Sequence, residues 1–151
     1  MASINPRNNG NLTGRLADDV RVFTNKDGSR KVVFTLITER DYLDKNGERP
    51  IDPIAVEQFI RADAKGLGPF ALIHKGDQVQ LNTSIRVDRF TNKNGEIEYV
   101  QKNEINAIIL LDSKKISQER LANRLKTVQA ENAALNAQAV QATEADTAPV
   151  A

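Results

Sequence analysis

The chain contains no cysteine and only one histidine. Without cysteine there can be no disulfide framework, no thiolate nucleophile and no zinc or iron–sulfur site with cysteine ligands. The single His74 cannot by itself build a histidine metal site, and no Gly-x-Ser-x-Gly or glycine-rich phosphate-loop pattern is present. We therefore expect no enzyme activity, no catalytic residue, no metal and no cofactor.

Long hydrophobic runs and a charge excess of one sign are also missing. The longest apolar run, 107–111, is far too short to cross a bilayer, and the first seven residues lack an apolar leader. With the lack of cysteine, this favours a cytoplasmic protein without a membrane partner. Lys and Arg number 21 against 20 Asp and Glu. That balance is weaker than the basic footprint of a protein held to nucleic acid by charge alone.

Residues 1–112 form a β-rich domain in this reading, with runs of Val, Ile, Thr and Phe between turn sequences. Turns ending at Gly28, Gly47 and Gly95 predict hairpin loops, because glycine supplies the positive φ that tight turns need. A glycine- and proline-broken segment, 61–75, predicts one short interstrand helix. The expected strands are 11–16 with 20–24, 30–40, 50–60, 77–90 and 96–111. The pattern predicts an all-β fold, a five-stranded OB-fold barrel followed by a helical or disordered tail.

The tail is rich in Ala and Gln and contains no aromatic residue. Residues 113–142 predict a helix with Ser117 as N-cap, because apolar residues recur at alternating spacings of four and three. Two interpretations stay open: a solvated or barrel-packed helix, and a coiled coil, which Asn132 and Ala139 in its seam would weaken. Residues 143–151 are polar, and we expect them to be disordered.

Side chains alternate between the two faces of a strand, which separates core positions from outward ones. In the fourth strand the core row is expected to be Val79, Leu81, Thr83, Ile85 and Val87. The opposite row is polar and ends in Phe90. Phe59 likewise lies opposite the apolar row of its strand, whereas Phe34 shares the core face of its strand. Phe23 and Phe70 receive no assignment from the pattern.

Outward aromatic residues suit single-stranded nucleic acid, because every base has a π-face that stacks on a ring while Lys and Arg contact the phosphates. Phe59 and Phe90 are such residues. Tyr42 lies beside Arg40 near the second hairpin, and Tyr99 lies in the last strand. The alternative for each ring is an ordinary half-buried sheet residue.

Several blocks resemble, in their order and spacing, the bacterial single-stranded-DNA-binding protein family. They are GRLADD at 14–19, VFTL at 33–36, YLDKNGE at 42–48, KGDQV at 75–79 and RVDRFTNKNGE at 86–96. The blocks span most of residues 5–112. The resemblance implies an OB fold, wrapping of single strands, assembly into homotetramers, and work at the nucleoid in DNA replication, recombination or repair.

The resemblance also implies roles for particular residues. Tyr42, Phe59 and Phe90 fall at base-stacking positions, and three arginines fall near phosphate-contacting ones. The full predicted DNA-binding set is Tyr42, Phe59, Phe90, Tyr99, Arg40, Arg86, Arg89 and Lys93. Pro53 stands where the family has another stacking aromatic, and Ala55 and Asp88 stand where a basic residue is common. We therefore expect this chain to have one base-stacking aromatic residue fewer than the family usually has, and to bind single-stranded DNA with a lower affinity.

The family's tail usually ends in an acidic cluster closed by Phe, which recruits replication and repair enzymes, and 146–151 do not match it. The expected partners are single-stranded DNA and further copies of the chain. The predicted function is sequence-independent binding and protection of single-stranded DNA. The alternatives are an OB module that binds RNA or a protein, and an oligomeric scaffold whose coiled coil is the working part.

Overall fold

The structure is a computed structural model that describes residues 4–146. The chain divides into two compact units, Met1–Ser117 and Gln118–Ala151. The sequence predicted a domain end at residue 112. The first unit also takes in the first turn of the following helix, because Ser117 is buried and its hydroxyl donates a hydrogen bond to Asp77.

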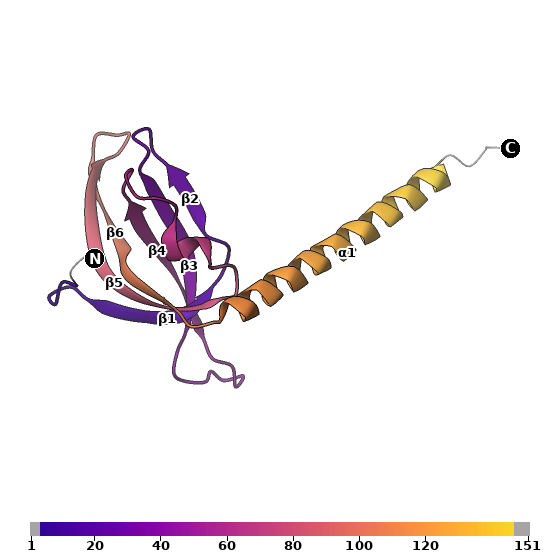
Figure 1. Ribbon diagram of the computed structural model, residues 1–151, viewed down its shortest axis with the longest axis horizontal. Coiled ribbons are helices and arrows are strands. Elements are labelled where there is room, and N and C mark those ends of the chain that lie inside the picture. Colours follow the sequence, from indigo (N-terminus) through magenta and orange to yellow (C-terminus); the bar gives the residue numbers. More distant parts are fainter. Residues whose placement is uncertain (1–3, 147–151) are drawn as a thin grey trace. The chain divides into compact units, whose positions relative to one another are not determined.

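The first unit is one six-stranded sheet that contains antiparallel and parallel strand pairs and closes nearly into a ring (Figure 1). The strands are β1 Gly10–Leu16, β2 Arg21–Thr24, β3 Arg30–Glu39, β4 Ile51–Ile60, β5 Gln78–Thr91 and β6 Ile97–Leu110. Their order is β1-β5-β6-β4-β3-β2. β1 also pairs with β3, through Arg15 opposite Ile37 and Leu16 opposite Leu36, and this contact closes the ring.

The expectation of five strands is wrong by one, because β2 is a strand of its own. It pairs with β3 alone, from Arg21 opposite Val33 to Thr24 opposite Arg30. β1 reaches β3 further along, at Ile37 and Leu36. The chain must leave the sheet between the two pairings, so 11–24 cannot run as one strand.

The three predicted hairpin turns are confirmed. They connect β2 to β3, β3 to β4 and β5 to β6, which are all antiparallel pairs. Their glycines have φ values of 86° at Gly28, 77° at Gly47 and 80° at Gly95. Only glycine adopts this conformation without steric cost.

The predicted interstrand helix is a single 3-10 turn, η1, at Gly68–Ala71. Pro69 stands at its start, where a missing N–H leaves no hydrogen bond unmade. The turn places Phe70 in the core, with its ring centroid 6.2 Å from that of Phe34. Phe34 is fully buried, as predicted.

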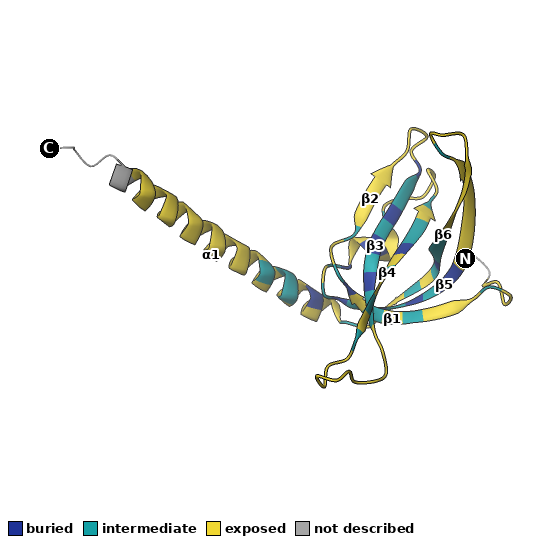
Figure 2. Ribbon diagram, turned by 180° about the vertical axis from the view of Figure 1, so that it is seen from behind, coloured by how far each residue is buried: buried dark blue, intermediate teal, exposed yellow. Residues whose placement is uncertain are grey.

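The predicted core row of β5 is correct only for its first half. Val79, Leu81 and Thr83 are buried, but Ile85 and Val87 are 50% and 61% exposed. Beyond Thr83, β5 pairs only with β6, and from Ile85 onward the residues of β5 on both faces are exposed, as the colouring in Figure 2 shows. We call residues 85–91 and 97–103 the arm.

The helix α1 spans Lys114–Asp146. Its N-cap is Ser113 rather than the predicted Ser117, since the Ile116 N–H donates to Ser113 Oγ at 3.3 Å. It includes 143–146, which the sequence predicted as disordered, and the rest of that segment, 147–151, lies outside the described residues. The seam residues Leu125, Val128 and Leu135 are exposed in the single chain.

Candidate nucleic-acid interface

Two exposed phenylalanines flank a lysine on the outer face of the sheet. Phe23 on β2 lies opposite Lys31 on β3, and Lys31 lies opposite Phe59 on β4. Residues directly opposite each other in a sheet project from the same face. Phe23 is 53% exposed and Phe59 is 58% exposed. The register therefore sets a cation between two solvent-facing rings.

A chain of ion pairs continues from Lys31 across the next strands. Lys31 Nζ lies 2.9 Å from Glu57 Oε2 on β4. The second oxygen of Glu57 lies 3.4 Å from Lys102 Nζ on β6. Lys102 Nζ in turn lies 2.6 Å from Asp88 Oδ2 on β5. Four charged side chains of alternating sign thus connect four strands.

The ion pair between Asp88 and Lys102 keeps both of its groups ionised. The hydrogen bond from Lys102 is the main cause that lowers the pKa of Asp88, and the positive charge of Lys102 adds to it. The same hydrogen bond, together with the negative charge of Glu57, raises the pKa of Lys102. Asp88 and Lys102 are therefore both charged throughout the neutral pH range.

Phe90 and Arg86 lie on the same face of β5 as Asp88, because each is two residues away from it. Phe90 is 43% exposed and borders an open hollow with Val100 and Lys102. Arg86 Nε lies 3.6 Å from Glu104 Oε2. We define the outer band as this set of side chains: Phe23, Lys31, Glu57, Phe59, Arg86, Asp88, Phe90, Lys102 and Glu104.

Two predicted site residues lie on the other face of the arm. Arg89 directly precedes Phe90 on β5 and lies opposite Tyr99 on β6. Both side chains therefore project from the face opposite to that of Phe90. Tyr99 is 68% exposed, beside the exposed apolar side chains of Val87 and Ile97. The structure therefore places Phe59, Phe90 and Arg86 on one face of the sheet, and Arg89 and Tyr99 on the other face of the arm.

Tyr42 and Arg40 lie away from the outer band. They begin the loop 40–50, which leaves the end of the ring opposite to the β2–β3 and β5–β6 turns (Figure 1). Arg40 Nη1 donates to the Tyr42 hydroxyl at 2.7 Å, and its Nε and Nη2 donate to Asp52 at 3.0 and 2.8 Å. These bonds raise the pKa of Arg40 and lower that of Asp52. Arg40 thus holds the exposed Tyr42 ring in place.

Lys93 lies at the tip of the β5–β6 turn and is exposed. The turn is held by Asn92, whose side-chain oxygen accepts from the N–H groups of Asn94 and Glu96 at 2.9 Å each. This local bonding fixes the conformation of the turn, on which the Lys93 side chain is exposed.

The outer face of β4 carries no ring on the side nearer Tyr42. Ala55, Pro53 and Ile51 project there, opposite Thr35, Ile37 and Glu39. Pro53 lacks an N–H, and β4 tolerates it because its second edge pairs with β6 only at Glu57 opposite Glu104. That DNA binding uses one stacking platform fewer stays a prediction.

Sequence reasoning missed Phe23 and, among the carboxylates of the outer band, the roles of Glu57 and Asp88. The length of the turn that ends at Gly28 could have located Phe23. That length sets the pairing register of the two strands and so places Phe23 opposite Lys31. Glu57 and Asp88 carry no such local signal. They meet Lys102 only through the pairing of distant strands.

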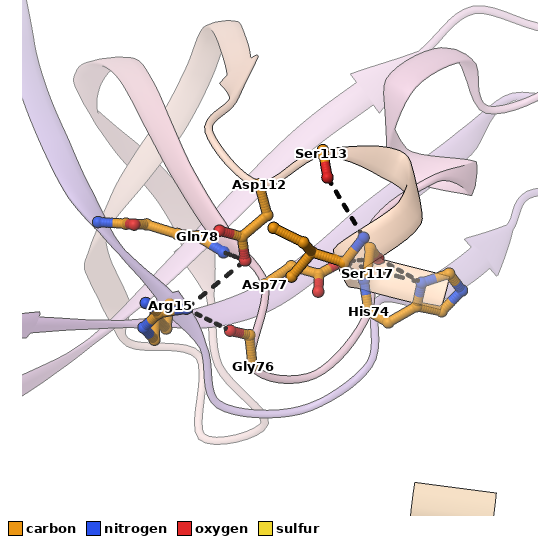
Figure 3. A network of polar contacts seen from close by, with 9 residues as sticks. Arg15, His74, Gly76, Asp77, Gln78, Asp112, Ser113 and Ser117 are labelled. Atoms are coloured by element: carbon orange, nitrogen blue, oxygen red, sulfur yellow. Dashed lines mark hydrogen bonds and ion pairs between the residues drawn. The ribbon is translucent and has the colours of Figure 1, made fainter. Parts of the chain in front are cut away.

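A second polar cluster ties the start of α1 to the β-unit (Figure 3). The Ser117 hydroxyl and the His74 main-chain N–H both donate to the buried carboxylate of Asp77, the latter at 2.9 Å. Nearby, Arg15 Nη1 donates to the Gly76 carbonyl at 3.0 Å and lies 3.5 Å from Asp112. The cluster joins β1, the start of β5 and the first turn of α1.

This cluster contains a serine, a histidine and an aspartate but is not arranged for nucleophilic catalysis. In a catalytic triad the two ring nitrogens of the histidine face serine and aspartate separately. Here one nitrogen, His74 Nδ1, faces both, at 3.4 Å from Ser117 Oγ and 3.9 Å from Asp77 Oδ2. Ser117 is also buried. The cluster is a structural joint.

Neither a metal site nor a membrane span is found in the part of the chain that the structure describes. Within residues 4–146, no three His, Cys, Asp or Glu side chains gather as metal ligands would. The helices of that same segment include none with the length and hydropathy that a bilayer crossing requires.

Fold and outer band together define a small, mainly β module that presents rings and paired charges on one sheet face. No model of a known protein family matches the chain. It is similar to a single-stranded DNA-binding protein of Lactiplantibacillus plantarum (strain ATCC BAA-793 / NCIMB 8826 / WCFS1), with 29% identity over 111 residues. The match covers 74% of this chain and 54% of the relative, so the chain spans about half of that protein's length. This distant homology confirms the resemblance seen in the sequence.

Proposed function

We propose that the chain binds single-stranded DNA without catalysis and with little sequence preference, on the outer band. The observation that carries the proposal is the set of exposed rings, Phe23, Phe59 and Phe90, on one sheet face, with Lys31 between Phe23 and Phe59. Bases of any sequence stack on such rings, each contributing ~1–3 kcal/mol. The name of the distant homologue supports the same ligand.

We infer that the ring of strands is an OB barrel. In support, β1 pairs with both β5 and β3, as a first strand shared between the two halves of a small barrel would. The single helical turn, η1, lies between β4 and β5. An OB barrel binds single strands on one face of its sheet and with the loops beside that face. In this chain the outer band lies on the sheet face, and the loop 40–50 is one of the connecting loops.

The positions of the rings suggest how the strand would run. Phe23, Phe59 and Phe90 would take bases in sequence from β2 towards the arm. Tyr42 lies outside this row, so a strand must bend around the ring to use it as well. Wrapping of this kind is what the resemblance to single-stranded-DNA-binding proteins implies.

Fluorescence anisotropy of labelled oligonucleotides tests the proposal, since the chain has no Trp whose quenching could report binding. Matched single-stranded DNA, single-stranded RNA and duplex DNA of equal length are titrated. We expect the single-stranded DNA to bind most tightly and the affinity to fall with salt. Equal affinity for duplex and single strand would refute it, and tighter binding of RNA would favour the alternative of an RNA-binding module.

We further propose a homo-oligomer, a tetramer by the resemblance, that serves DNA replication, recombination or repair at the nucleoid. The exposed apolar residues Val87 and Ile97 on the second face of the arm offer a protein contact. A chain ending at Ser117 should stay oligomeric and still bind DNA. If sedimentation shows that it is a monomer without DNA affinity, the tail assembles the protein and the scaffold alternative gains support.

A further inference from the structure

Every cation of the outer band already faces a carboxylate of the same chain. Lys31 is paired with Glu57, Lys102 with Glu57 and Asp88, and Arg86 with Glu104. The band therefore holds three cations and three carboxylates among its described side chains. A surface offered to a polyanion would be expected to leave its lysines open, so the pairing itself needs a reason.

We propose that Glu57 and Asp88 compete with the phosphates of the bound strand for Lys31 and Lys102, and so set the affinity and salt dependence of binding. The inference rests on the proposed function. It identifies two carboxylates, Glu57 and Asp88, that the pairing of the strands sets beside the lysines and that weaken DNA binding, whereas the aromatic rings strengthen it.

Counterion release is the physical basis of the proposal. A lysine that neutralises a phosphate of a single strand releases condensed counterions and steepens the dependence of log K on log salt by about 0.7. A lysine already neutralised by a carboxylate contributes no such release. Either its phosphate contact is not made, or the displaced carboxylate must take up a cation from solution. Both routes cancel the gain.

Geometry makes Glu57 the central competitor. Its two oxygens contact two different lysines, at 2.9 and 3.4 Å. Its side chain is 23% exposed and that of Lys102 is 28% exposed, so solvent screens this contact less than a fully exposed pair. Asp88 adds the shortest contact, at 2.6 Å from Lys102 Nζ. Phosphate therefore meets both lysines with their charge already balanced.

The test compares the full chain with the double variant Glu57→Gln/Asp88→Asn by anisotropy, between about 50 and 200 mM salt, on one single-stranded DNA. Neutral amides keep the side-chain shapes but free both lysines. We expect the salt slope to steepen by about 1.4, two lysines at about 0.7 each. The variant's gain in affinity should then be roughly sevenfold greater at the lower salt concentration than at the higher.

Asp18→Asn is the matched control for the single variant Glu57→Gln, which frees Lys31 while Asp88 still neutralises Lys102. Asp18 lies 3.7 Å from Lys75 Nζ, so the control also frees one lysine and changes the net charge equally, but outside the outer band. Glu57→Gln should steepen the slope by about 0.7, and the control should leave it at the wild-type value. An equal steepening in Asp18→Asn and Glu57→Gln would mean a general charge effect and would overturn the proposal.

Further outcomes separate this inference from the function on which it rests. If the wild-type chain binds single-stranded DNA but the folded double variant has the wild-type slope, competition is refuted and the proposed function stands. If neither binds, both fail. Should the double variant not fold, Lys102→Gln gives the same answer. Loss of an already neutralised lysine should leave the slope unchanged, and a slope shallower by about 0.7 would refute the proposal.

Discussion

Replacing Gly14 with alanine should open the ring at its seam. Gly14 lies on β1, next to the two residue pairs that join β1 to β3. An added Cβ would overlap the carbonyl oxygen of Ile37 and lie 2.8 Å from its carbonyl carbon. These are backbone atoms and cannot rotate away, so β1 or β3 must move. The glycine is required for close approach and not for its φ, which is not positive.

The expected cost follows from what the movement breaks. Overpacking of this kind costs ~1–3 kcal/mol. Weakening the hydrogen bonds of the β1–β3 pairing adds ~0.5–1.5 kcal/mol for each bond lost. Alanine recovers ~0.4–1 kcal/mol by restricting the unfolded chain. We expect a net loss of about 2–4 kcal/mol, a large part of the ~5–15 kcal/mol that stabilises a small domain.

Gly10→Ala is the matched control, on the same strand and with the same substitution. Its added Cβ would meet only Thr83 Oγ1, at 3.8 Å, which is ordinary contact. Urea unfolding followed by far-ultraviolet circular dichroism should show the control at or above wild-type stability and Gly14→Ala well below it. If the two variants unfold within about 0.5 kcal/mol of each other, the ring is not closed at Gly14 as described.

Three further predictions concern the rings and the acid groups. Phe90→Ala should weaken single-strand binding by ~1–3 kcal/mol in anisotropy titrations without lowering the melting temperature. Phe34→Ala should instead cost ~3–5 kcal/mol of stability through its cavity, and a similar melting loss in both variants would show that Phe90 belongs to the core. The pKa values of Asp52 and Asp88 are lowered from 3.8 by their cationic partners, so these pairs stabilise the fold above that pH. Thermal melts should be insensitive to them from pH 7 to about 5 and show their loss only below about 4, and a loss centred near pH 6 would contradict this assignment.

Local chemistry explains what could be predicted of the fold. Gly28, Gly47 and Gly95 mark hairpins because a positive φ is needed within the turn itself, whatever surrounds it. Phe34 was assigned to the core because its neighbours two residues away are also apolar, and burial on one face needs only that alternation. Both signals lie within a few residues of the position that they describe.

The remaining features depend on where strands end and which strands meet. Alternation sets Val87 on the core side of β5, but within residues 4–146 no second sheet layer covers that side of the arm, so Val87 is exposed. The same limit applies to the site. Phe90 and Tyr99 lie on opposite faces because the β5–β6 register pairs Phe90 with Glu98 and Tyr99 with Arg89. The exposure of Phe59 and Phe90 agrees with the sequence prediction, and their DNA contacts stay a prediction.

The arm has a consequence for solubility. Over 97–103, within the described chain, β6 pairs with β5 on one side and with no strand on the other. Such an edge offers unpaired backbone groups to any other extended chain, including another copy of the protein. Charged side chains along this edge, such as Glu98 and Lys102, oppose stacking of one arm on the next. Replacing them with apolar residues would turn a surface suited to a flexible strand into a template for aggregation.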